Sequence, residues 1–382
     1  MNRKEYQNRI QKAFLANPVV ALLGPRQCGK TTLARDYIGS FTKFPSANYF
    51  DLEDPVHLDR LEQNPKVVLS MLSGLVVIDE VQRMPNLFPL LRVLVDDPSL
   101  SLRFLILGSA SRDLIQQSSE TLAGRITHLE IAPFSALETR EIQKLWIRGG
   151  FPRSYLAQTE ETSFDWRKAY ISTFLERDIP MLGIQIPPES LRRFWAMLAH
   201  CHANVLNSSE IGKSLGITHT TVRRYLDILV GTFMVRQLQP WFENIRKRQV
   251  KLPKIFFRDS GLLHTLLGIR DLNALHLHPK LGASWEGMAL EQIIRFHNAD
   301  AEDCYFWGVH NQGELDLMIV QDGKKIGFEF KFAEKTQMTR SMQMAIDELK
   351  LDYLTVIVPG DTEYPLADRI KVIGISKYFH LK

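Results

Sequence analysis

The chain has 382 residues, more than one hydrophobic core usually serves, and this length predicts two or three domains. Hydrophobic residues make up 45% of it and charged residues 24%, a composition that excludes extensive disorder and fibrous repeats. The longest apolar runs fall far short of the ~20 residues that span a bilayer, and no apolar stretch follows the basic N-terminus. Three widely separated cysteines form neither a metal knuckle nor a disulfide framework. We therefore expect a soluble, cytoplasmic protein with no membrane partner.

The net charge of +4 is unevenly distributed along the chain. Residues 190–260 contain twelve Lys or Arg and four Asp or Glu, a local charge of +8, so the remaining residues sum to −4. A basic middle segment in a slightly acidic protein suggests a module that faces a polyanion. A solvated helical surface is the alternative, and composition alone does not separate the two.

The first 140 residues alternate short apolar runs with helical patterns, which is typical of a parallel sheet covered by helices. A helix is predicted from Lys30 to about Ile38, directly after the first strand. The predicted strands are residues 18–23, 47–51, 74–79, 102–107 and 128–131.

Helical periodicity dominates after Pro133 up to about Arg270, most clearly at residues 191–200 and 220–230. Beyond Leu281 the pattern becomes mixed again. It predicts helices at residues 284–297 and 339–349 and strands at residues 303–307, 314–321, 325–332 and 354–358. We therefore expect an α/β chain of three domains, residues 1–140, 141–270 and 271–382.

One segment fits the phosphate-binding pattern GxxxxGK followed by Ser or Thr at every fixed position, namely Gly24-Pro25-Arg26-Gln27-Cys28-Gly29-Lys30-Thr31. It follows a predicted strand and opens a predicted helix, which disfavours a chance Gly/Lys turn. Such glycines let backbone N–H groups converge on phosphate oxygens at a helix N-terminus. Lys30 can reach the β- and γ-phosphates, and the Thr31 hydroxyl can bind Mg²⁺. The residues predicted to bind ATP are Gly24, Gly29, Lys30, Thr31 and Thr32.

Polar residues at the ends of two later strands predict the rest of a hydrolytic site. The apolar run at residues 75–78 ends in Asp79 and Glu80, of which Asp79 is expected to hold Mg²⁺ through water and Glu80 to orient the attacking water. Ser109 ends the next strand, in the segment Gly108-Ser109-Ala110-Ser111, and could contact the γ-phosphate or the catalytic water.

Arg125 precedes the fifth predicted strand and is a further catalytic candidate. An arginine there could neutralise transition-state charge, within its own subunit or across the interface of a homo-oligomer. A surface ion pair is the alternative. Arg26, within the phosphate-binding segment, has a weaker case for contacting phosphate.

The segments 24–31, 75–80, 104–111 and 123–125 resemble AAA-type P-loop ATPases of bacteria and archaea. The similarity is strongest to the subgroup that pairs this ATPase with a C-terminal domain of unknown function. Three later segments also match that subgroup, namely Gly149-Gly150-Phe151-Pro152, Leu175-Glu176-Arg177-Asp178-Ile179 and residues 257–263. The resemblance implies an AAA-like fold with binding and hydrolysis of ATP. It further implies that Arg153 could contact nucleotide, although a structural role is the simpler interpretation.

The basic middle segment contains the spacing of a helix-turn-helix. A capped helix at residues 208–215 ends at a glycine turn, and a second helix begins near His219 and carries Arg223 and Arg224. Hydroxyls, a histidine and two arginines suit contacts with DNA phosphates and bases. Residues 233–239 and 246–254 are predicted to form a hairpin wing. A protein-interaction or linker role for this winged helix is the alternative.

A constellation of charged residues marks the C-terminal strands. Asp316 lies thirteen residues before Glu329, and Lys331 follows on the same face as Glu329. Two carboxylates and an ammonium group suit Mg²⁺-assisted phosphodiester hydrolysis. The order resembles the restriction-endonuclease-like superfamily, with Glu286 as the supporting helix glutamate. Gln343, on the following helix, could complete the site.

These features predict an ATP-driven protein that acts on DNA, with ATP and Mg²⁺ as cofactors. A nucleotide-regulated protein-interaction switch, with an inactive C-terminal domain, is the alternative. A nuclease regulated by the ATPase is a third interpretation. For the C-terminal constellation, a fold without cleavage and a solvated hairpin also remain open.

Overall fold

The computed structural model describes residues 3–109, 120–242, 249–310, 312–333 and 335–380. The chain divides into two compact units, residues 1–133 with 231–233, and residues 134–230 with 234–382. Within the described ranges, no helix is long and apolar enough to cross a membrane.

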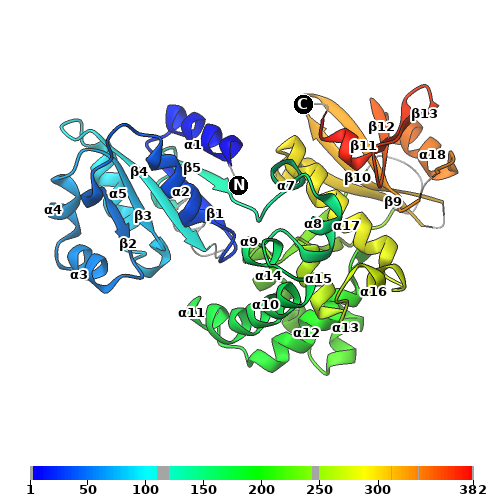
Figure 1. The fold of residues 1–382 in the computed structure, drawn as a ribbon, viewed down its shortest axis with the longest axis horizontal. Coiled ribbons are helices and arrows are strands. Elements are labelled where there is room, and N and C mark those ends of the chain that lie inside the picture. Colours follow the sequence, from blue (N-terminus) through cyan, green and yellow to red (C-terminus); the bar gives the residue numbers. More distant parts are fainter. Residues whose placement is uncertain (1–2, 110–119, 243–248, 311, 334, 381–382) are drawn as a thin grey trace. The chain divides into compact units, whose positions relative to one another are not determined.

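The first unit is built on a five-stranded sheet with the order β2-β3-β4-β1-β5 (Figure 1). All four strand pairs are parallel, as the alternation of apolar runs and helical patterns predicts. The strands are β1 (Val19–Gly24), β2 (Tyr49–Asp51), β3 (Gly74–Asp79), β4 (Leu102–Ser109) and β5 (Ile126–Glu130).

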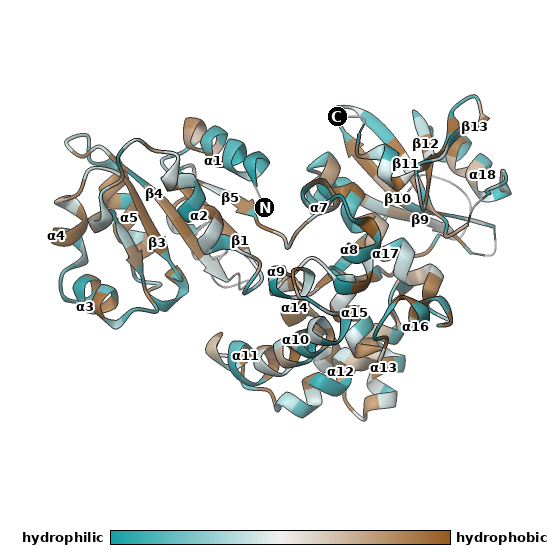
Figure 2. Cartoon of the chain, in the orientation of Figure 1, coloured by the Kyte–Doolittle hydropathy of each residue, from teal (hydrophilic) through white to brown (hydrophobic). Residues whose placement is uncertain are grey.

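Helices cover both faces of this sheet, and alternate strand residues supply two separate cores. Val20, Leu22 and Leu105 pack with α1 and α2, whereas Ala21 and Ile78 pack on the opposite face with α5 and the α3–α4 segment. The central residues of β3 and β4 are hydrophobic (Figure 2). The helices are α1 (Lys4–Ala16), α2 (Lys30–Gly39), α3 (Pro55–Gln63), α4 (Pro65–Ser70) and α5 (Leu87–Asp96), with 3-10 turns η1 (Ser46–Asn48) and η2 (Val81–Arg83).

The second strand is shorter than the sequence predicts. The 3-10 turn η1 replaces its beginning, and the buried Asn48 amide donates hydrogen bonds of 2.9 Å to the carbonyls of Ser73 and Leu75. An asparagine that satisfies two backbone carbonyls in this way favours a turn over a strand.

The second unit combines a helical segment with a nine-stranded sheet (Figure 1). Its α-helices up to residue 231 are α7 (Ala136–Thr139), α8 (Ile142–Arg148), α9 (Pro152–Tyr155), α10 (Glu160–Thr173), α11 (Ile179–Met181), α12 (Pro188–His200), α13 (Ser208–Leu215) and α14 (His219–Gly231). The π-helical turn η3 (Phe174–Asp178) joins α10 to α11. The later helices are α15 (Ser260–Leu266), α16 (Leu272–His276), α17 (Leu281–His297), α18 (Arg340–Leu349) and α19 (Ile375–Tyr378), with the 3-10 turn η4 (Ala301–Asp303).

The strands of this sheet have the order β13-β14-β12-β11-β10-β9-β7-β8-β6. They are β6 (Asn204–Val205), β7 (Val235–Pro240), β8 (Lys254–Phe257), β9 (Cys304–Val309), β10 (Gly313–Gln321), β11 (Lys324–Phe330), β12 (Tyr353–Val358), β13 (Glu363–Ala367) and β14 (Ile370–Gly374). The helix α17 packs on the central strands through one large apolar cluster.

Residues 134–230 and 234–382 form one compact unit, whereas the sequence predicts separate middle and C-terminal domains. The reason is a strand pairing that crosses the predicted boundary. Gln239 and Pro240 of β7 pair in parallel with Tyr305 and Phe306 of β9, so one sheet runs through both segments.

The predicted hairpin is present with different bounds. β7 pairs antiparallel with β8, but β8 begins only at Lys254, where the predicted strand ends. Residues 246–248 of the predicted wing lie outside the described residues, and Gln249 forms an isolated bridge to Val309.

Candidate functional site

The phosphate-binding segment lies where the sequence predicts it, between the end of β1 at Gly24 and the start of α2 at Lys30. A Cβ atom on Gly24 would lie 2.1 Å from the Ile131 carbonyl oxygen, so only glycine fits there. Gly29 has a φ of +95°, which favours glycine immediately before the helix. Glycines at these two positions are what a phosphate-binding loop ahead of a helix requires.

The Lys30 side chain is held inside this curve. Its Nζ atom donates hydrogen bonds to the carbonyl oxygens of Gly24 (3.0 Å) and Pro25 (2.9 Å). The residue is buried, so its positive charge faces the loop rather than bulk solvent. This position suits a contact with phosphate oxygens.

The helix α2 and the strand β3 meet through Thr31 and Asp79. The Thr31 hydroxyl donates a 2.7 Å hydrogen bond to Asp79 Oδ2, and the Tyr49 hydroxyl donates a 3.1 Å hydrogen bond to the same oxygen. Burial raises the pKa of the Asp79 carboxyl group, while the hydrogen bonds from Thr31 and Tyr49 oppose that rise.

This donor set fits a magnesium ion held beside a bound nucleotide. Such an ion takes few protein ligands, because phosphate and water oxygens complete its shell. Thr31 offers a hydroxyl and Asp79 a carboxylate within one hydrogen bond of each other. Thr31 and Asp79, the two residues predicted to bind Mg²⁺, therefore lie next to each other.

The strand order also brings Glu80 and Ser109 to the same edge of the sheet. β4 lies between β1 and β3, and Ser109 is paired with Gly24. Gln82 connects the two candidates, because its Nε2 atom donates to Glu80 Oε2 and, at 3.0 Å, to Ser109 Oγ. Burial raises the pKa of Glu80, while Lys30 opposes that rise. Ala110 and Ser111, which follow in the predicted motif, lie outside the described residues.

Two further candidates, Thr32 and Arg26, differ in exposure: Thr32 is exposed, whereas Arg26 is half-buried and opposes the rise that burial causes in the pKa of Glu80. Thr32 is exposed on the first turn of α2, one residue after Thr31. Arg26 forms a 2.6 Å ion pair with the exposed Glu53. The position of Thr32 gives it no specific role.

Arg125 lies where the parallel strands begin, whereas the phosphate loop lies where they end. The following residue, Ile126, pairs with Val19 at the start of β1, whereas the loop follows Gly24, about 16 Å along the strand. Arg125 Nε instead forms a 2.6 Å ion pair with Asp96. The structure therefore does not bring Arg125 to the nucleotide site of its own subunit, and the role across an interface remains a prediction.

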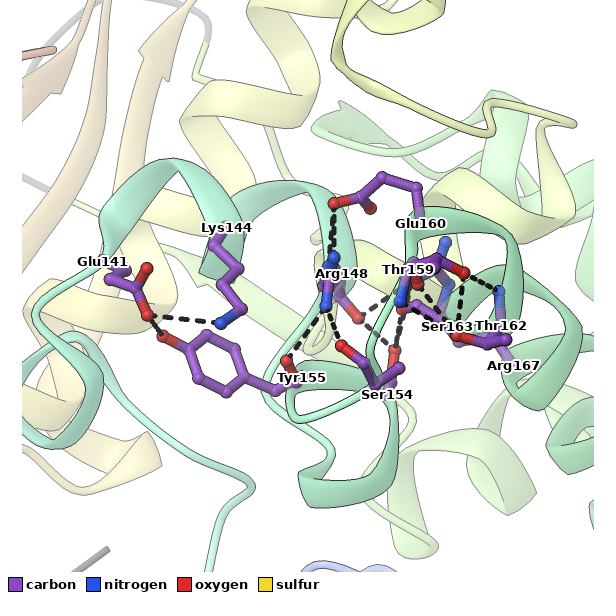
Figure 3. Close-up of polar contacts among 11 residues, drawn as sticks. Glu141, Lys144, Arg148, Ser154, Tyr155, Thr159, Glu160, Thr162, Ser163 and Arg167 are labelled. Atoms are coloured by element: carbon purple, nitrogen blue, oxygen red, sulfur yellow. Dashed lines mark hydrogen bonds and ion pairs between the residues drawn. The ribbon is translucent and has the colours of Figure 1, made fainter.

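A polar network lies on both sides of the Gly-Gly-Phe-Pro segment of the second unit, at Arg148 and Ser154 (Figure 3). Arg167 Nη1 donates to the Arg148 carbonyl oxygen (3.2 Å) and to the hydroxyls of Ser154 (3.1 Å) and Ser163 (2.7 Å). Burial lowers the pKa of Arg167 to about 10. Arg153 stays exposed on α9. A structural role for this part of the chain, rather than a nucleotide contact, remains the simpler interpretation.

The predicted helix-turn-helix corresponds to α13 and α14. Asn207 Oδ1 caps α13 by accepting from the N–H groups of Ser209 (3.1 Å) and Glu210 (3.3 Å), and Gly216 ends the helix. Four apolar residues of α14 are buried, namely Val222, Tyr225, Leu226 and Leu229. The polar residues His219, Thr220, Arg223 and Arg224 are exposed, as a surface that contacts a polyanion requires.

The C-terminal constellation is assembled around Asp316. Lys331 Nζ lies 2.7 Å from Glu329 Oε2 and 3.7 Å from Asp316 Oδ2. A second ammonium group, that of Lys254, lies 3.9 Å from Asp316 Oδ1, 3.4 Å from Glu286 Oε1 and in contact with Glu314. Four carboxylates and two lysines therefore share one cluster, which we call the C-terminal carboxylate cluster.

Burial and mutual repulsion shape the charges of this cluster. Burial raises the pKa of both Glu286 and Glu329 to about 8, and the Asp316 carboxylate adds to each rise. Burial alone would lower the pKa of Lys254, but Glu286, Asp316 and Glu314 raise it.

The predicted nuclease metal does not fit this arrangement. Among the described residues, no group of three or more His, Cys, Asp or Glu side chains could hold a metal ion. Ammonium groups lie against both Asp316 oxygens and against Glu329, the oxygens that a metal would need. Gln343, proposed to complete the site, is exposed and donates to Asp347 at 2.9 Å instead.

Sequence reasoning missed four residues of these sites. Gln82 follows Glu80 by two residues, and Glu314 precedes Asp316 by two, so strand alternation could have found Glu314. Tyr49 and Lys254 come from distant segments, and no local signal marks them.

Three protein families match successive parts of the chain. Residues 16–140 match the AAA domain family, residues 139–273 match a domain of unknown function (DUF8612), and residues 281–378 match another (DUF4143). The expected AAA-type P-loop ATPase with a C-terminal domain of unknown function is thereby confirmed. Among solved structures, the Walker-type ATPase PABY2304 of Pyrococcus abyssi matches 70% of this chain and 95% of its own, with a TM-score of 0.49 and 15% identity.

Two curated relatives cover nearly the whole chain. They are the uncharacterized proteins Mb2031c of Mycobacterium bovis and Rv2008c of Mycobacterium tuberculosis. Each is 47% identical over 378 residues, which is 98% of this chain and 83% of the relative. The chain therefore belongs to the family of these two mycobacterial proteins, with an AAA-type P-loop ATPase domain ahead of a DUF4143 domain.

Proposed function

We propose that the protein hydrolyses ATP in its first unit and that its second unit contacts duplex DNA. The observation that carries the ATPase part of the proposal is the hydrogen bond between Thr31 and Asp79, which joins the phosphate loop to the carboxylates at the end of β3. The AAA domain match over residues 16–140 supports the same assignment.

Each residue at this edge has a defined task in the proposed reaction. Lys30 and the loop N–H groups bind the β- and γ-phosphates. Thr31 and Asp79 would hold a Mg²⁺ ion, whose chemistry is to offset negative charge on the phosphates. Glu80 accepts a hydrogen bond from the attacking water and orients it, and Gln82 and Ser109 hold Glu80 in position.

The DNA contact is proposed for α13, α14 and the β7–β8 hairpin, together with β6. A helix, a short strand, two helices and an antiparallel hairpin follow one another here, and β6 pairs with β8. This order is that of a winged helix, and the exposed Arg223 and Arg224 lie near the start of its second helix. Asp316 and Glu329 lie on the adjacent strands β10 and β11, and this placement supports a nuclease-like C-terminal domain as part of the proposal.

An ATPase assay with and without duplex DNA tests this proposal. The wild-type protein should release phosphate from ATP in the presence of Mg²⁺, and DNA should change the rate. Lys30→Ala should lose ATP binding in calorimetry, because the buried ammonium contact to phosphate is removed. Failure of the wild-type protein to bind ATP with Mg²⁺ would overturn the proposal for the first unit.

The second candidate function is a nucleotide-regulated protein-interaction switch with an inactive C-terminal domain. The position of Lys254 among the C-terminal carboxylates favours it over a nuclease regulated by the ATPase, because the cluster does not fit a metal. ATP hydrolysis that DNA does not change, together with no DNA binding at low salt, would favour the switch.

A further inference from the structure

The ammonium group of Lys254 is surrounded by carboxylate oxygen atoms. The residue is on β8, and its side chain is only 6% exposed. Three carboxylates reach its ammonium group, two from β10 (Glu314 and Asp316) and one from α17 (Glu286). The ring of Phe306 lies 5.5 Å from the same nitrogen. The carboxylates balance the positive charge of this buried ammonium group, as they would balance the charge of a bound metal ion.

Lys331 completes the charge compensation from the other side of Asp316. Asp316 Oδ2 accepts a 3.0 Å hydrogen bond from the Phe330 N–H group and lies 3.7 Å from Lys331 Nζ, while Oδ1 lies 3.9 Å from Lys254 Nζ. The Lys331 side chain is 40% exposed and can turn into solvent without moving the backbone. Lys254 cannot do so, because it is buried on a strand that is paired on both sides.

We infer that Lys254 takes the place of a divalent metal ion in the C-terminal carboxylate cluster, so that its ammonium group and a metal ion exclude each other there. A magnesium or manganese ion needs carboxylate oxygens at about 2.0–2.2 Å, and it could not approach Asp316 while a positive charge lies against Oδ1. A lysine supplies one positive charge from within the chain and needs no metal from solution.

Lys254 and its partners come from two different segments of the second unit. Lys254 belongs to the segment that matches DUF8612, whereas its carboxylate partners belong to the segment that matches DUF4143. The lysine therefore joins the two segments, and metal can enter the cluster only if β8 moves. This inference concerns the second unit alone, so it stands or fails independently of ATP hydrolysis in the first.

Manganese binding to the full-length protein, measured by electron paramagnetic resonance without nucleotide, tests the inference. All proteins carry Asp79→Asn, which removes the metal ligand of the first unit. With Lys254 present, no manganese should bind at the C-terminal cluster. Lys254→Met should gain one manganese ion per chain at this cluster, because the freed oxygens become ligands. Adding Asp316→Asn to Lys254→Met should abolish this binding.

Lys251→Met is the matched control, because Lys251 is exposed three residues earlier in the same segment. It should gain no manganese site. Asp316-dependent manganese binding to the protein with Lys254 intact would overturn the inference. A folded Lys254→Met protein that binds no manganese would overturn it too.

Folding of the variants is checked separately by tryptophan fluorescence and circular dichroism. If Lys254→Met does not fold, Lys254→Met with Glu286→Gln removes one buried negative charge and keeps Glu314, Asp316 and Glu329 as ligands. If that protein is also unfolded, manganese should restore its tryptophan fluorescence, since the metal replaces the missing cation. No restoration by manganese would count against the inference.

Discussion

The Thr31 hydroxyl donates a 2.7 Å hydrogen bond to Asp79 Oδ2, although 48 residues separate the two along the chain. The bond crosses from the first turn of α2 to the end of β3, and β4 lies between β3 and the strand that leads into the phosphate loop. Parallel strands place all their carboxyl ends at one edge of the sheet. The proposed hydrolytic groups therefore lie together at that edge.

Glu80→Gln should keep ATP binding while turnover falls roughly 100-fold or more, because the amide cannot accept the water proton as the carboxylate does. Single-turnover measurement of phosphate release, with nucleotide affinity measured in parallel, checks this. Glu53→Gln is a suitable control, since Glu53 is an exposed partner of Arg26 and should leave turnover unchanged. Equal turnover in the Glu80→Gln and wild-type proteins would show that a residue other than Glu80 orients the attacking water.

Gln82→Ala should lower turnover by roughly 10-fold to 100-fold with little change in ATP affinity. The amide joins Glu80 to Ser109, and without it the carboxylate loses its fixed position. Steady-state kinetics separates the two effects, because a positioning role lowers kcat and leaves KM almost unchanged. A loss confined to KM would instead show that Gln82 contacts the nucleotide.

Changing Arg223 and Arg224 together to Ala should weaken binding to duplex DNA and reduce its salt dependence by about two counterions. Both arginines are exposed on α14. Arg192 and Arg193, on the earlier helix α12, form the matched control, because Arg192 is already paired with Glu176 at 3.3 Å. Fluorescence anisotropy at several salt concentrations measures both slopes. Similar losses in the two double variants would argue against α14 as the DNA-contacting helix.

A mixing experiment tests whether Arg125 acts across a subunit interface. Arg125→Ala and Glu80→Gln should each lack ATPase activity, yet an equal mixture should recover part of it, because some interfaces then contain both intact residues. Asp96→Ala removes the ion-pair partner of Arg125 and should leave the isolated protein active. If Arg125→Ala alone retains full activity, the arginine is a surface ion-pair residue only.

Glu291→Gln should destabilise the second unit at neutral pH by roughly 3–5 kcal/mol, because it leaves buried arginines without a carboxylate. Burial alone would raise the pKa of Glu291, but Arg236, Arg258 and Arg295 lower it to about 2. Since the folded pKa lies below the unfolded value, this stabilisation is fully present above about pH 5 and is lost as the pH falls toward 2. The difference in the free energy of unfolding between the wild-type and variant proteins should therefore become smaller as the pH falls from about 5 toward 2.

Urea unfolding followed by tryptophan fluorescence measures this difference. All six tryptophans lie between residues 146 and 307, so the signal reports on the second unit alone. Glu302→Gln, at an exposed residue of η4, should leave stability unchanged. A difference that stays constant from pH 7 to pH 3 would contradict the assigned pKa shift.

The sequence by itself determined the α/β class of the first domain, its phosphate-binding segment and the strand that ends at Asp79 and Glu80. These are local features, because a glycine pattern and an apolar run ending in carboxylates depend on neighbouring residues. The same local reasoning located α14 and the strands that carry Asp316 and Glu329, with bounds that differ by a few residues.

Only the tertiary structure decided which distant residues meet. Strand order placed Ser109 beside the phosphate loop and Arg125 where the parallel strands begin, although both flank strands of one sheet. The pairing of β7 with β9 joined the middle and C-terminal segments in one sheet, and Lys254 of β8 lies in the C-terminal carboxylate cluster. The physical reason is that strand order and long-range ion pairing depend on contacts between segments far apart in the chain, which residue spacing does not encode.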